Sequence, residues 1–261
     1  DDSDSVAEHA SVDTNVLAND KFADLPGAKV TDVTQGQYGE VTINEDGTVK
    51  YIPKTDWLAE GETLTDTYQY TVTTAAGNTE TATVTITITG TNEEPLLKAN
   101  ATGSVTEDTS GSETASGSLT RDVHFTDVDT NDNSFTTTGI KFGNVDGTVG
   151  QEIKGEYGKL VIDESGNYSY SIDKGADNAK VDSLKAGETV TDTFTATVSD
   201  GHGGIVEIPI VITVTGTNDA PIASDNSSQE NDVKVVIEDD STANATTGNV
   251  ITSGTPDSDV D

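Results

Sequence analysis

Apolar and polar residues alternate along several segments of this chain. One segment places Tyr68, Tyr70 and Val72 at every second position, with Gln69 and Thr71 between them. A period of two is what a β-strand shows when one face is buried and the other meets solvent. The same period recurs in three further runs: Ala82, Val84, Ile86 and Ile88; Phe194, Ala196 and Val198; and Val206, Ile208, Ile210, Ile212 and Val214. The pattern predicts long, half-buried strands.

Turn-forming strings separate these runs. Residues 44–47 read Asn-Glu-Asp-Gly and residues 163–166 read Asp-Glu-Ser-Gly, a composition typical of hairpin loops. No long segment shows the apolar period of about 3.6 residues that marks an amphipathic helix. We therefore expect an all-β protein built from β-sandwich domains, with a β-solenoid or a barrel as the alternative.

The sequence repeats itself. Residues 56–95 align without a gap on residues 182–221, and nearly half of the aligned positions are identical. Upstream, residues 38–43 match residues 157–162 at a shorter offset, so the second copy carries a small insertion near residues 174–180. Repeats of this kind decide the architecture, because each copy forms one structural unit.

A third copy begins near the C-terminus, where residues 236–239 resemble residues 105–108. The predicted division is repeat 1 at 1–95, repeat 2 at 96–221 and an incomplete start of repeat 3 at 222–261. The chain contains no Met, which suggests a piece of a longer protein.

Composition narrows the possible functions. The formal net charge is -34, from 13 Lys plus Arg against 47 Asp plus Glu, which argues against nucleic acid and anionic membranes as partners. No apolar run is long enough to span a bilayer. Leu, Ile, Val and Phe make up roughly a fifth of the chain, near the composition of disordered proteins. The alternating pattern argues against disorder, and bound cations would relieve the charge repulsion.

Enzyme chemistry finds little support. Paired carboxylates could serve a glycosidase, but aromatic residues are only 5% of the chain, too few for a typical sugar cleft. His9, His124 and His202 are scattered without metal-ligand spacing, and there is no Cys. We expect no catalytic site. Trp57, the single tryptophan, is expected to cover an end of its sandwich rather than to bind a glycan.

Three strings of the second copy, residues 184–194, 198–201 and 214–221, resemble the VCBS-type, cadherin-like tandem repeats of large secreted bacterial adhesins of the type I secretion (RTX) class. The resemblance implies cadherin-like or immunoglobulin-like sandwiches that act as spacers at the cell surface of Gram-negative bacteria and support attachment and biofilm formation. It also implies a monomer whose partners are neighbouring repeats, with a host glycan or protein bound through the parent molecule.

Calcium at the joints between repeats is a further implication of the resemblance. Ca²⁺ takes six to eight oxygen ligands, and strings such as Asp127-Val128-Asp129 offer carboxylates at alternate positions. The expected ligands of the first joint are Glu62, Asn92, Glu93, Asp127, Asp129 and Asp200, with Glu8 as a looser candidate. Those of the second joint are Glu107, Glu188, Asn218, Asp219, Asp257 and Asp259, and Asp66 and Asp192 are second-line candidates.

Two alternatives stay open. The acidic residues could serve solubility alone, as charge runs commonly do, and the linkers carry Gly90 and Gly216 where cadherin linkers have an Asp. The second alternative is a ligand-binding module that recognises a glycan or protein through the loops of repeat 2, at residues 134–156 and 174–180. An aromatic-lined pocket there would favour that function.

Overall fold

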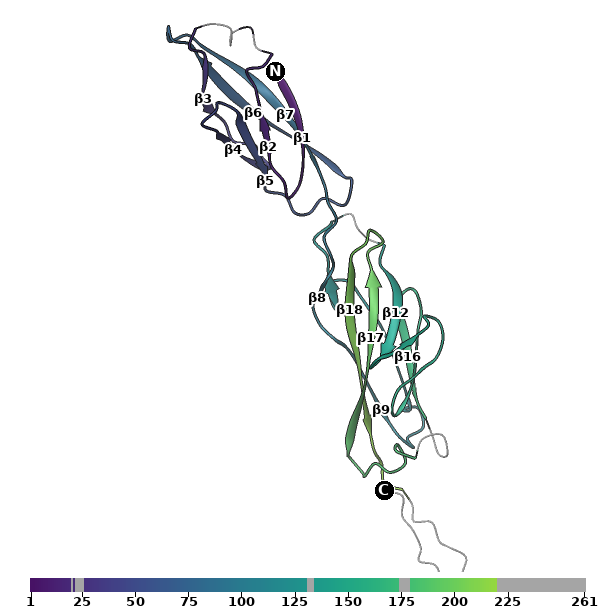
Figure 1. Ribbon diagram of the computed structural model, residues 1–261. Helices are drawn as coiled ribbons and strands as arrows, with labels where there is room; N and C mark the ends of the chain where they lie inside the picture. The colour runs from purple at the N-terminus through teal and green to yellow at the C-terminus, as the bar shows by residue number, and fades with distance from the viewer. Residues whose placement is uncertain (20, 22–25, 131–133, 174–178, 220–261) are drawn as a thin grey trace, which may run out of the picture.

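The computed structural model describes residues 1–19, 21, 26–130, 134–173 and 179–219, and these residues form β-strands without an α-helix. The strands build two elongated sandwiches that follow one another end to end (Figure 1). The prediction of an all-β protein made of tandem β-sandwiches is confirmed. Within the described residues, no helix has the length and apolar character needed to cross a membrane.

The first sandwich packs a four-stranded sheet against a three-stranded sheet around one core. The larger sheet has the order β1 (Asp2–Ala7), β7 (Thr79–Thr89), β6 (Thr63–Thr73) and β3 (Lys29–Val33), and the smaller has β2 (Val12–Thr14), β5 (Val49–Pro53) and β4 (Gly39–Ile43). Tyr51 from the smaller sheet and Tyr70 and Ile86 from the larger are almost completely buried. Each large apolar side chain buried in this way stabilises the fold by about 1.5–3 kcal/mol.

The second sandwich repeats this plan with more strands. Its five-stranded sheet runs β13 (Val145–Gly147), β12 (Thr136–Phe142), β17 (Thr189–Ser199), β18 (Ile205–Thr215) and β9 (Ala101–Thr106), and its four-stranded sheet runs β10 (Thr114–Ser118), β16 (Asn167–Ile172), β15 (Gly158–Ile162) and β14 (Ile153–Lys154). A small ribbon pairs β8 (Leu96–Leu97) with β11 (Phe125–Thr126) near the linker. All the long apolar runs of the sequence lie in one of the two cores.

Both sandwiches are built around a long antiparallel hairpin, β6–β7 in the first and β17–β18 in the second. In each, the first strand joins the last in parallel, β1 beside β7 and β9 beside β18. Alternate residues of β6 and β17 are buried, as the sequence period predicts. The outward faces carry rows of Thr, a residue whose branched side chain favours strands.

A buried tyrosine–aspartate pair recurs in both sandwiches. The Tyr51 hydroxyl donates to Asp66 Oδ2 at 2.5 Å, and the Tyr170 hydroxyl donates to Asp192 Oδ2 at 2.8 Å. Backbone N–H groups complete the set: those of residues 37, 38 and 67 donate to Asp66, and those of residues 156 and 157 donate to Asp192. The second-line ligand candidates Asp66 and Asp192 therefore hold each sandwich together internally.

The matching segments 38–43 and 157–162 both begin with Tyr-Gly, and the buried tyrosines explain the glycine. A Cβ at Gly39 would lie 2.1 Å from Tyr51 Cζ, and a Cβ at Gly158 would lie 2.4 Å from the Tyr170 hydroxyl oxygen. Only glycine lets the backbone pass this close to the ring.

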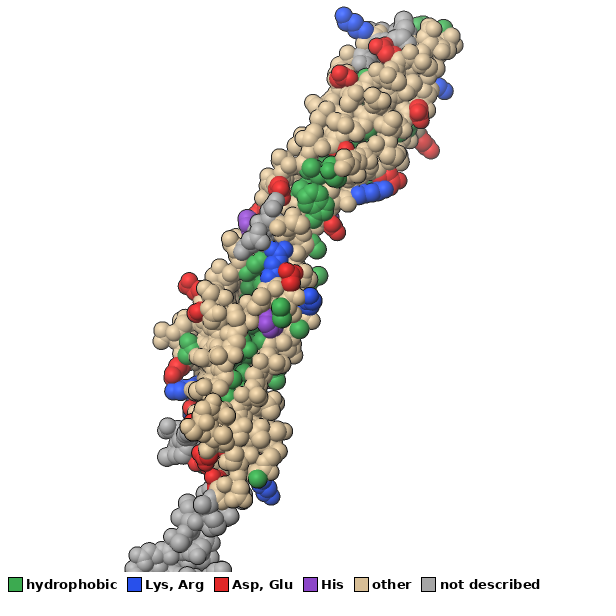
Figure 2. Space-filling view, turned by 180° about the vertical axis from the view of Figure 1, so that it is seen from behind, with side chains coloured by type: hydrophobic (Ala, Val, Ile, Leu, Met, Phe, Trp, Pro, Cys, Tyr) green, Lys and Arg blue, Asp and Glu red, His purple; other side chains and the backbone are tan. Residues whose placement is uncertain are grey.

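Acidic side chains are spread along the surface of the molecule and outnumber the basic ones, as the space-filling view shows (Figure 2). A net charge of this size disfavours compact states through self-repulsion. The elongated arrangement of two narrow sandwiches spreads that charge over a long surface.

Candidate metal joint between the two sandwiches

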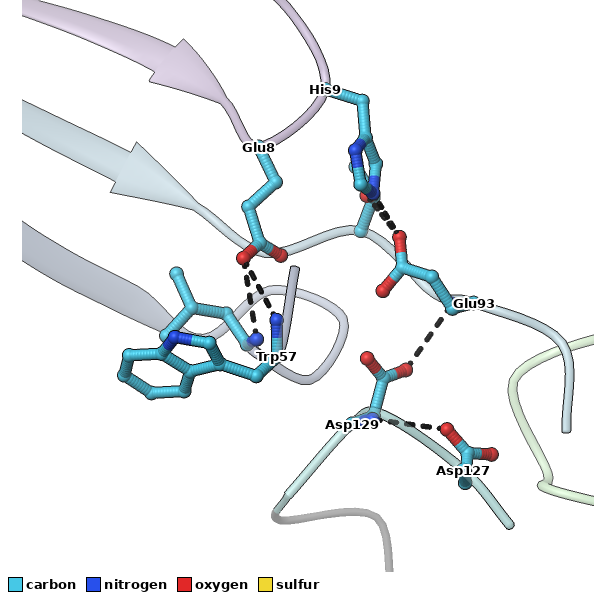
Figure 3. Close-up of polar contacts among 8 residues, drawn as sticks. Glu8, His9, Trp57, Glu93, Asp127 and Asp129 are labelled. Atoms are coloured by element: carbon cyan, nitrogen blue, oxygen red, sulfur yellow. Dashed lines mark hydrogen bonds and ion pairs between the residues drawn. The ribbon is translucent and has the colours of Figure 1, made fainter. Parts of the chain in front are cut away.

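Five segments meet where the first sandwich ends and the second begins. The first sandwich contributes the turn after β1 with Glu8 and His9, the loop at residues 54–62, and the linker at residues 90–95. The second contributes the loop at residues 127–130 and the turn at residues 200–204. Figure 3 shows residues of four of these segments: Glu8 and His9, Trp57, the linker residue Glu93, and Asp127 and Asp129.

Glu8 closes the end of the first sandwich. Its side chain is only 1% exposed, and its Oε1 accepts hydrogen bonds from the backbone N–H groups of Trp57 at 3.2 Å and Leu58 at 3.4 Å. The second carboxylate oxygen, Oε2, is buried and has no hydrogen-bond partner among the described residues. Trp57 packs partly buried against the first core, as expected of a residue that covers the sandwich end.

The linker is held by acids of the second sandwich. The backbone N–H of Glu93 donates to Asp129 Oδ2 at 3.2 Å, and Asn92 Nδ2 donates to Asp200 Oδ2 at 3.1 Å. Glu93 Oε1 accepts from the Thr91 hydroxyl at 3.1 Å and also contacts the His9 ring. Asn92 Oδ1 and Glu93 Oε2 are buried and have no partner within the described part of the chain.

The Asp127–Asp129 loop is more buried than solubilising acids would be. Asp127 is 7% exposed and Asp129 is 0% exposed, and the Asp129 backbone N–H donates to Asp127 Oδ1 at 3.0 Å. Burial, followed by the neighbouring carboxylates of Glu93 and Asp127, raises the pKa of Asp129 to about 7. Asp129 Oδ1 is buried without a partner in the described residues.

Asp200 binds the turn that follows β17. Its Oδ1 accepts from the backbone N–H groups of His202 at 2.7 Å and Gly204 at 3.0 Å, while its Oδ2 faces Asn92. A Cβ at position 204 would lie 2.0 Å from Asp200 Oδ2, so this close approach requires glycine. The structure therefore brings Asp200 beside Asn92, and Asp129 beside the neighbouring linker residue Glu93.

The predicted residues Glu62 and Glu188 occupy equivalent turns before the long hairpins. Glu62 Oε2 accepts from the backbone N–H of Ala59 at 3.2 Å, and Glu188 Oε2 accepts from that of Lys185 at 3.1 Å. Both carboxylates therefore close their own loops in this structure.

The far end of the second sandwich repeats the arrangement at Glu8. Glu107 is 3% exposed, its Oε1 accepts from the Thr217 N–H at 2.8 Å, and its Oε2 is buried without a partner in the described residues. Burial raises the pKa of Glu107 to about 6, with further contributions from Asp219, Asp108 and Asp182. Asn218 Nδ2 donates to the Asp219 carbonyl oxygen at 2.8 Å. Asp257 and Asp259 lie outside the described residues.

Three contacts of the joint were not found from the sequence. The Thr130 N–H and hydroxyl both donate to the Trp57 carbonyl oxygen, at 3.1 and 3.2 Å. His202 Nδ1 lies 2.9 Å from Glu60 Oε2, and His9 pairs with Glu93. These pairs link residues far apart in the chain, so no local pattern marks them.

The chemical types of the donor atoms at the joint suit a hard cation such as Ca²⁺. The buried atoms without partners on Glu8, Asn92, Glu93 and Asp129 are carboxylate and amide oxygens, the ligand types that Ca²⁺ prefers. In the described ranges, however, no three acidic or histidine side chains form a ready-made metal-binding group. An ion at this joint would therefore need the side chains to converge on it.

A charged cleft lies at the edge of the loop at residues 134–156, which was considered for ligand binding. A space of about 320 Å³ is lined by Glu152, Lys154, Lys159 and Asp173. Lys159 pairs with Glu152 at 3.1 Å and Lys154 with Asp173 at 3.6 Å. This lining contains no aromatic ring, so it lacks the feature that would favour glycan recognition.

Comparison with known proteins places this architecture in context. The family model described as bacterial cadherin-like domain matches residues 1–90 and again residues 92–216. No curated protein sequence matches the chain. Among solved structures, Drosophila N-cadherin EC1-4 is 15% identical with a TM-score of 0.46, and the match covers 85% of this chain and 50% of that chain. Human CDH23 EC21-23 is 17% identical with a TM-score of 0.46, and 85% of this chain covers 75% of it. The chain thus spans about half the length of the N-cadherin fragment.

Proposed function

The chain belongs to the bacterial cadherin-like domain family, and from this premise we propose that it is a spacer whose sandwiches are locked end to end by Ca²⁺. The observation that carries the proposal is a set of buried oxygens without partners at the joint. Glu8, Asn92, Glu93 and Asp129 each contribute one, and they come from both sandwiches and the linker.

Buried carboxylate oxygens need compensation. A buried charge without a partner is strongly unfavourable, and proteins normally pair it, neutralise it or bind a metal. A divalent cation shared by the two sandwiches would supply the missing partner and offset the repulsion between neighbouring carboxylates. Binding energy of this kind is realised only when both sandwiches are in place, so the ion would restrict their relative motion.

The proposed ligands follow from burial and position. For the first joint they are Glu8, Glu62, Asn92, Glu93, Asp127, Asp129 and Asp200, and for the second Glu107, Glu188, Asn218, Asp219, Asp257 and Asp259. Ca²⁺ at these joints would bind with a dissociation constant of about 10⁻⁴ to 10⁻³ M, as in other extracellular modules.

The wider role we propose is structural rather than catalytic. The chain would be two repeats, at residues 1–95 and 96–221, and the beginning of a third at residues 222–261. It would act as an extracellular, monomeric extender of a bacterial adhesin of the VCBS and RTX kind and so support attachment and biofilm formation. Membership of a cadherin-like family supports this role, since such modules connect to neighbouring domains.

Calcium titration of chelator-stripped protein by calorimetry tests the proposal, with solution scattering as a second readout. Saturable binding together with a longer, stiffer scattering profile is the expected result. Asp129→Asn should weaken binding at the first joint, whereas Asp146→Asn, the same change at an exposed residue of β13, should leave it unchanged. Flat heats and an unchanged profile would refute the calcium joint.

A further inference from the structure

Arg121 is the only arginine of the chain, and its side chain contacts the loop that carries Asp127 and Asp129. Its Nη2 donates to the Asp127 carbonyl oxygen at 2.9 Å and to the Asp129 carbonyl oxygen at 3.1 Å. One guanidinium group thus holds both backbone carbonyls of the Asp-Xaa-Asp string. Carbonyl oxygens held in this way keep the loop in one conformation.

The guanidinium is itself fixed in place. Its Cζ lies 5.2 Å from the centroid of the Phe135 ring, and that ring packs edge-on against Phe125 with centroids 4.9 Å apart. A cation stacked on an aromatic face is held by the ring quadrupole. Arginine suits this position because its planar group can stack and donate hydrogen bonds at the same time.

The turn that carries Arg121 is also ordered by local bonds. Asp122 adopts a left-handed conformation with φ 67°, and its N–H donates to the Phe125 carbonyl oxygen at 2.7 Å. The His124 N–H donates to the Thr120 carbonyl oxygen at 2.9 Å. These hydrogen bonds therefore fix the backbone from which the Arg121 side chain extends.

We propose that Arg121 is a positioning residue that pre-forms the Asp127–Asp129 loop and thereby sets the calcium affinity of the first joint. The inference rests on the proposed function of that joint. Groups that orient metal ligands without touching the metal typically change affinity by about 10 to 100-fold when they are replaced. The positive charge also offsets the repulsion between Asp127 and Asp129 while no ion is bound.

The segment that follows Glu8 in the first repeat has neither the Asp-Xaa-Asp string nor the cation. Residues 9–20 contain no Asp-Xaa-Asp string and no Lys or Arg. The Asp127–Asp129 loop and Arg121 thus occur together in the second repeat, on the side that faces the first joint.

The test compares Arg121→Lys with Lys98→Gln by calcium titration of the chelator-stripped chain. Lys98 Nζ donates to the Asp122 carbonyl oxygen in the same turn, so its loss removes a cation nearby without touching the loop carbonyls. We expect Arg121→Lys to weaken calcium binding about 10-fold or more and Lys98→Gln to change it little. Arg121→Lys keeps the charge, so its effect reports the stacked, planar geometry.

The outcomes separate the two claims. Unaltered affinity in Arg121→Lys, or an equal loss in both variants, would overturn the positioning role and leave the calcium joint standing. Failure of the unmutated chain to bind calcium would overturn the joint and this inference together. The melting temperature in chelator checks that Arg121→Lys is folded.

Hydrogen exchange on the unmutated chain gives a second test that needs no variant. If Arg121 pre-forms the loop, the Asp129 amide should be protected before calcium is added, and calcium should add little protection. Free exchange of that amide in the calcium-free protein would overturn the proposal.

Discussion

Two kinds of buried carboxylate lie in this molecule, and they differ in how completely they are satisfied. Inside the sandwiches, Asp66 and Asp192 accept hydrogen bonds from a tyrosine hydroxyl and from several backbone N–H groups. At the sandwich ends, Glu8, Asp129 and Glu107 are as deeply buried, yet each keeps an oxygen without a partner. Burial alone therefore does not separate the acids of the proposed ion sites from the interior acids, whereas the acceptor without a partner does.

The pKa values of Asp66, Asp129 and Glu107 differ in the same sense. For Asp66, burial opposes the charged form, but the hydrogen bonds from Tyr51 and the backbone outweigh it and lower the pKa. For Asp129 and Glu107, burial dominates and raises the pKa to about 7 and about 6. Hydrogen bonds thus favour the anionic form of Asp66, while burial disfavours the anionic forms of Asp129 and Glu107.

The largest effect should come from breaking an interior pair. Asp192→Ala leaves the buried Tyr170 hydroxyl and the partly buried N–H groups of Glu156 and Tyr157 without their acceptor, and a buried polar group left unpaired costs about 1–3 kcal/mol. We expect the free energy of unfolding of the second sandwich to fall by roughly 3–5 kcal/mol. Urea unfolding in chelator and in calcium should give the same loss, because this acid belongs to the fold.

Tyr170→Phe is the matched control, since it removes only the hydroxyl that reaches Asp192. Its cost should be smaller, because the backbone N–H groups still hold the carboxylate. A loss from Asp192→Ala that disappears in calcium would contradict the division between interior and end acids.

Calcium removal should have the next largest effect, and only at the ends. A ligand present at 100 times its dissociation constant stabilises the folded state by about 2.7 kcal/mol. We expect a chelator to remove an increment of about that size from the unmutated chain and a smaller one from Asp129→Asn. Thermal unfolding with and without calcium measures both, and equal increments would exclude Asp129 as a ligand.

The pH dependence of the interior pair gives a finer test. The pKa of Asp66 is lower in the folded state than in the unfolded chain. Its contribution to the free energy of unfolding is therefore complete above the pKa of the unfolded chain, about 3.9. It is lost as the pH falls through the lower folded value. The stability difference between the unmutated chain and Asp66→Asn should therefore narrow in acid, because a protonated Asp resembles Asn. A difference that stays constant from neutral pH to about pH 2 would contradict the assignment.

Sequence patterns predicted the sandwiches and the segments that meet at the joint. The period of two identified Tyr68, Tyr70 and Val72 as inward-facing, because alternation along a strand is a local property. The family resemblance assigned Glu8 to the first joint and Glu107 to the second, and the structure buries both side chains.

The contacts that define the joint could not be read in the same way. Asp66 and Asp129 are both acids in short polar strings, and only the fold shows that Asp66 meets a tyrosine hydroxyl and Asp129 the backbone N–H of Glu93. The contacts of Arg121 with the joint could not be predicted from the sequence, because its partners are backbone carbonyls, which every residue carries. Hydrogen bonds between distant segments depend on the packing of whole sheets.

The smallest effect should come from the exposed pair that crosses the joint. His202 and Glu60 lie 2.9 Å apart, but their side chains are 39% and 56% exposed, and solvent-exposed ion pairs contribute about 0–1 kcal/mol. Glu60→Gln should therefore leave calcium affinity and the melting temperature nearly unchanged, as calorimetry and thermal unfolding would show. A large loss of calcium affinity in this variant would mean that exposed contacts, rather than buried oxygens without partners, decide how the two sandwiches are held together.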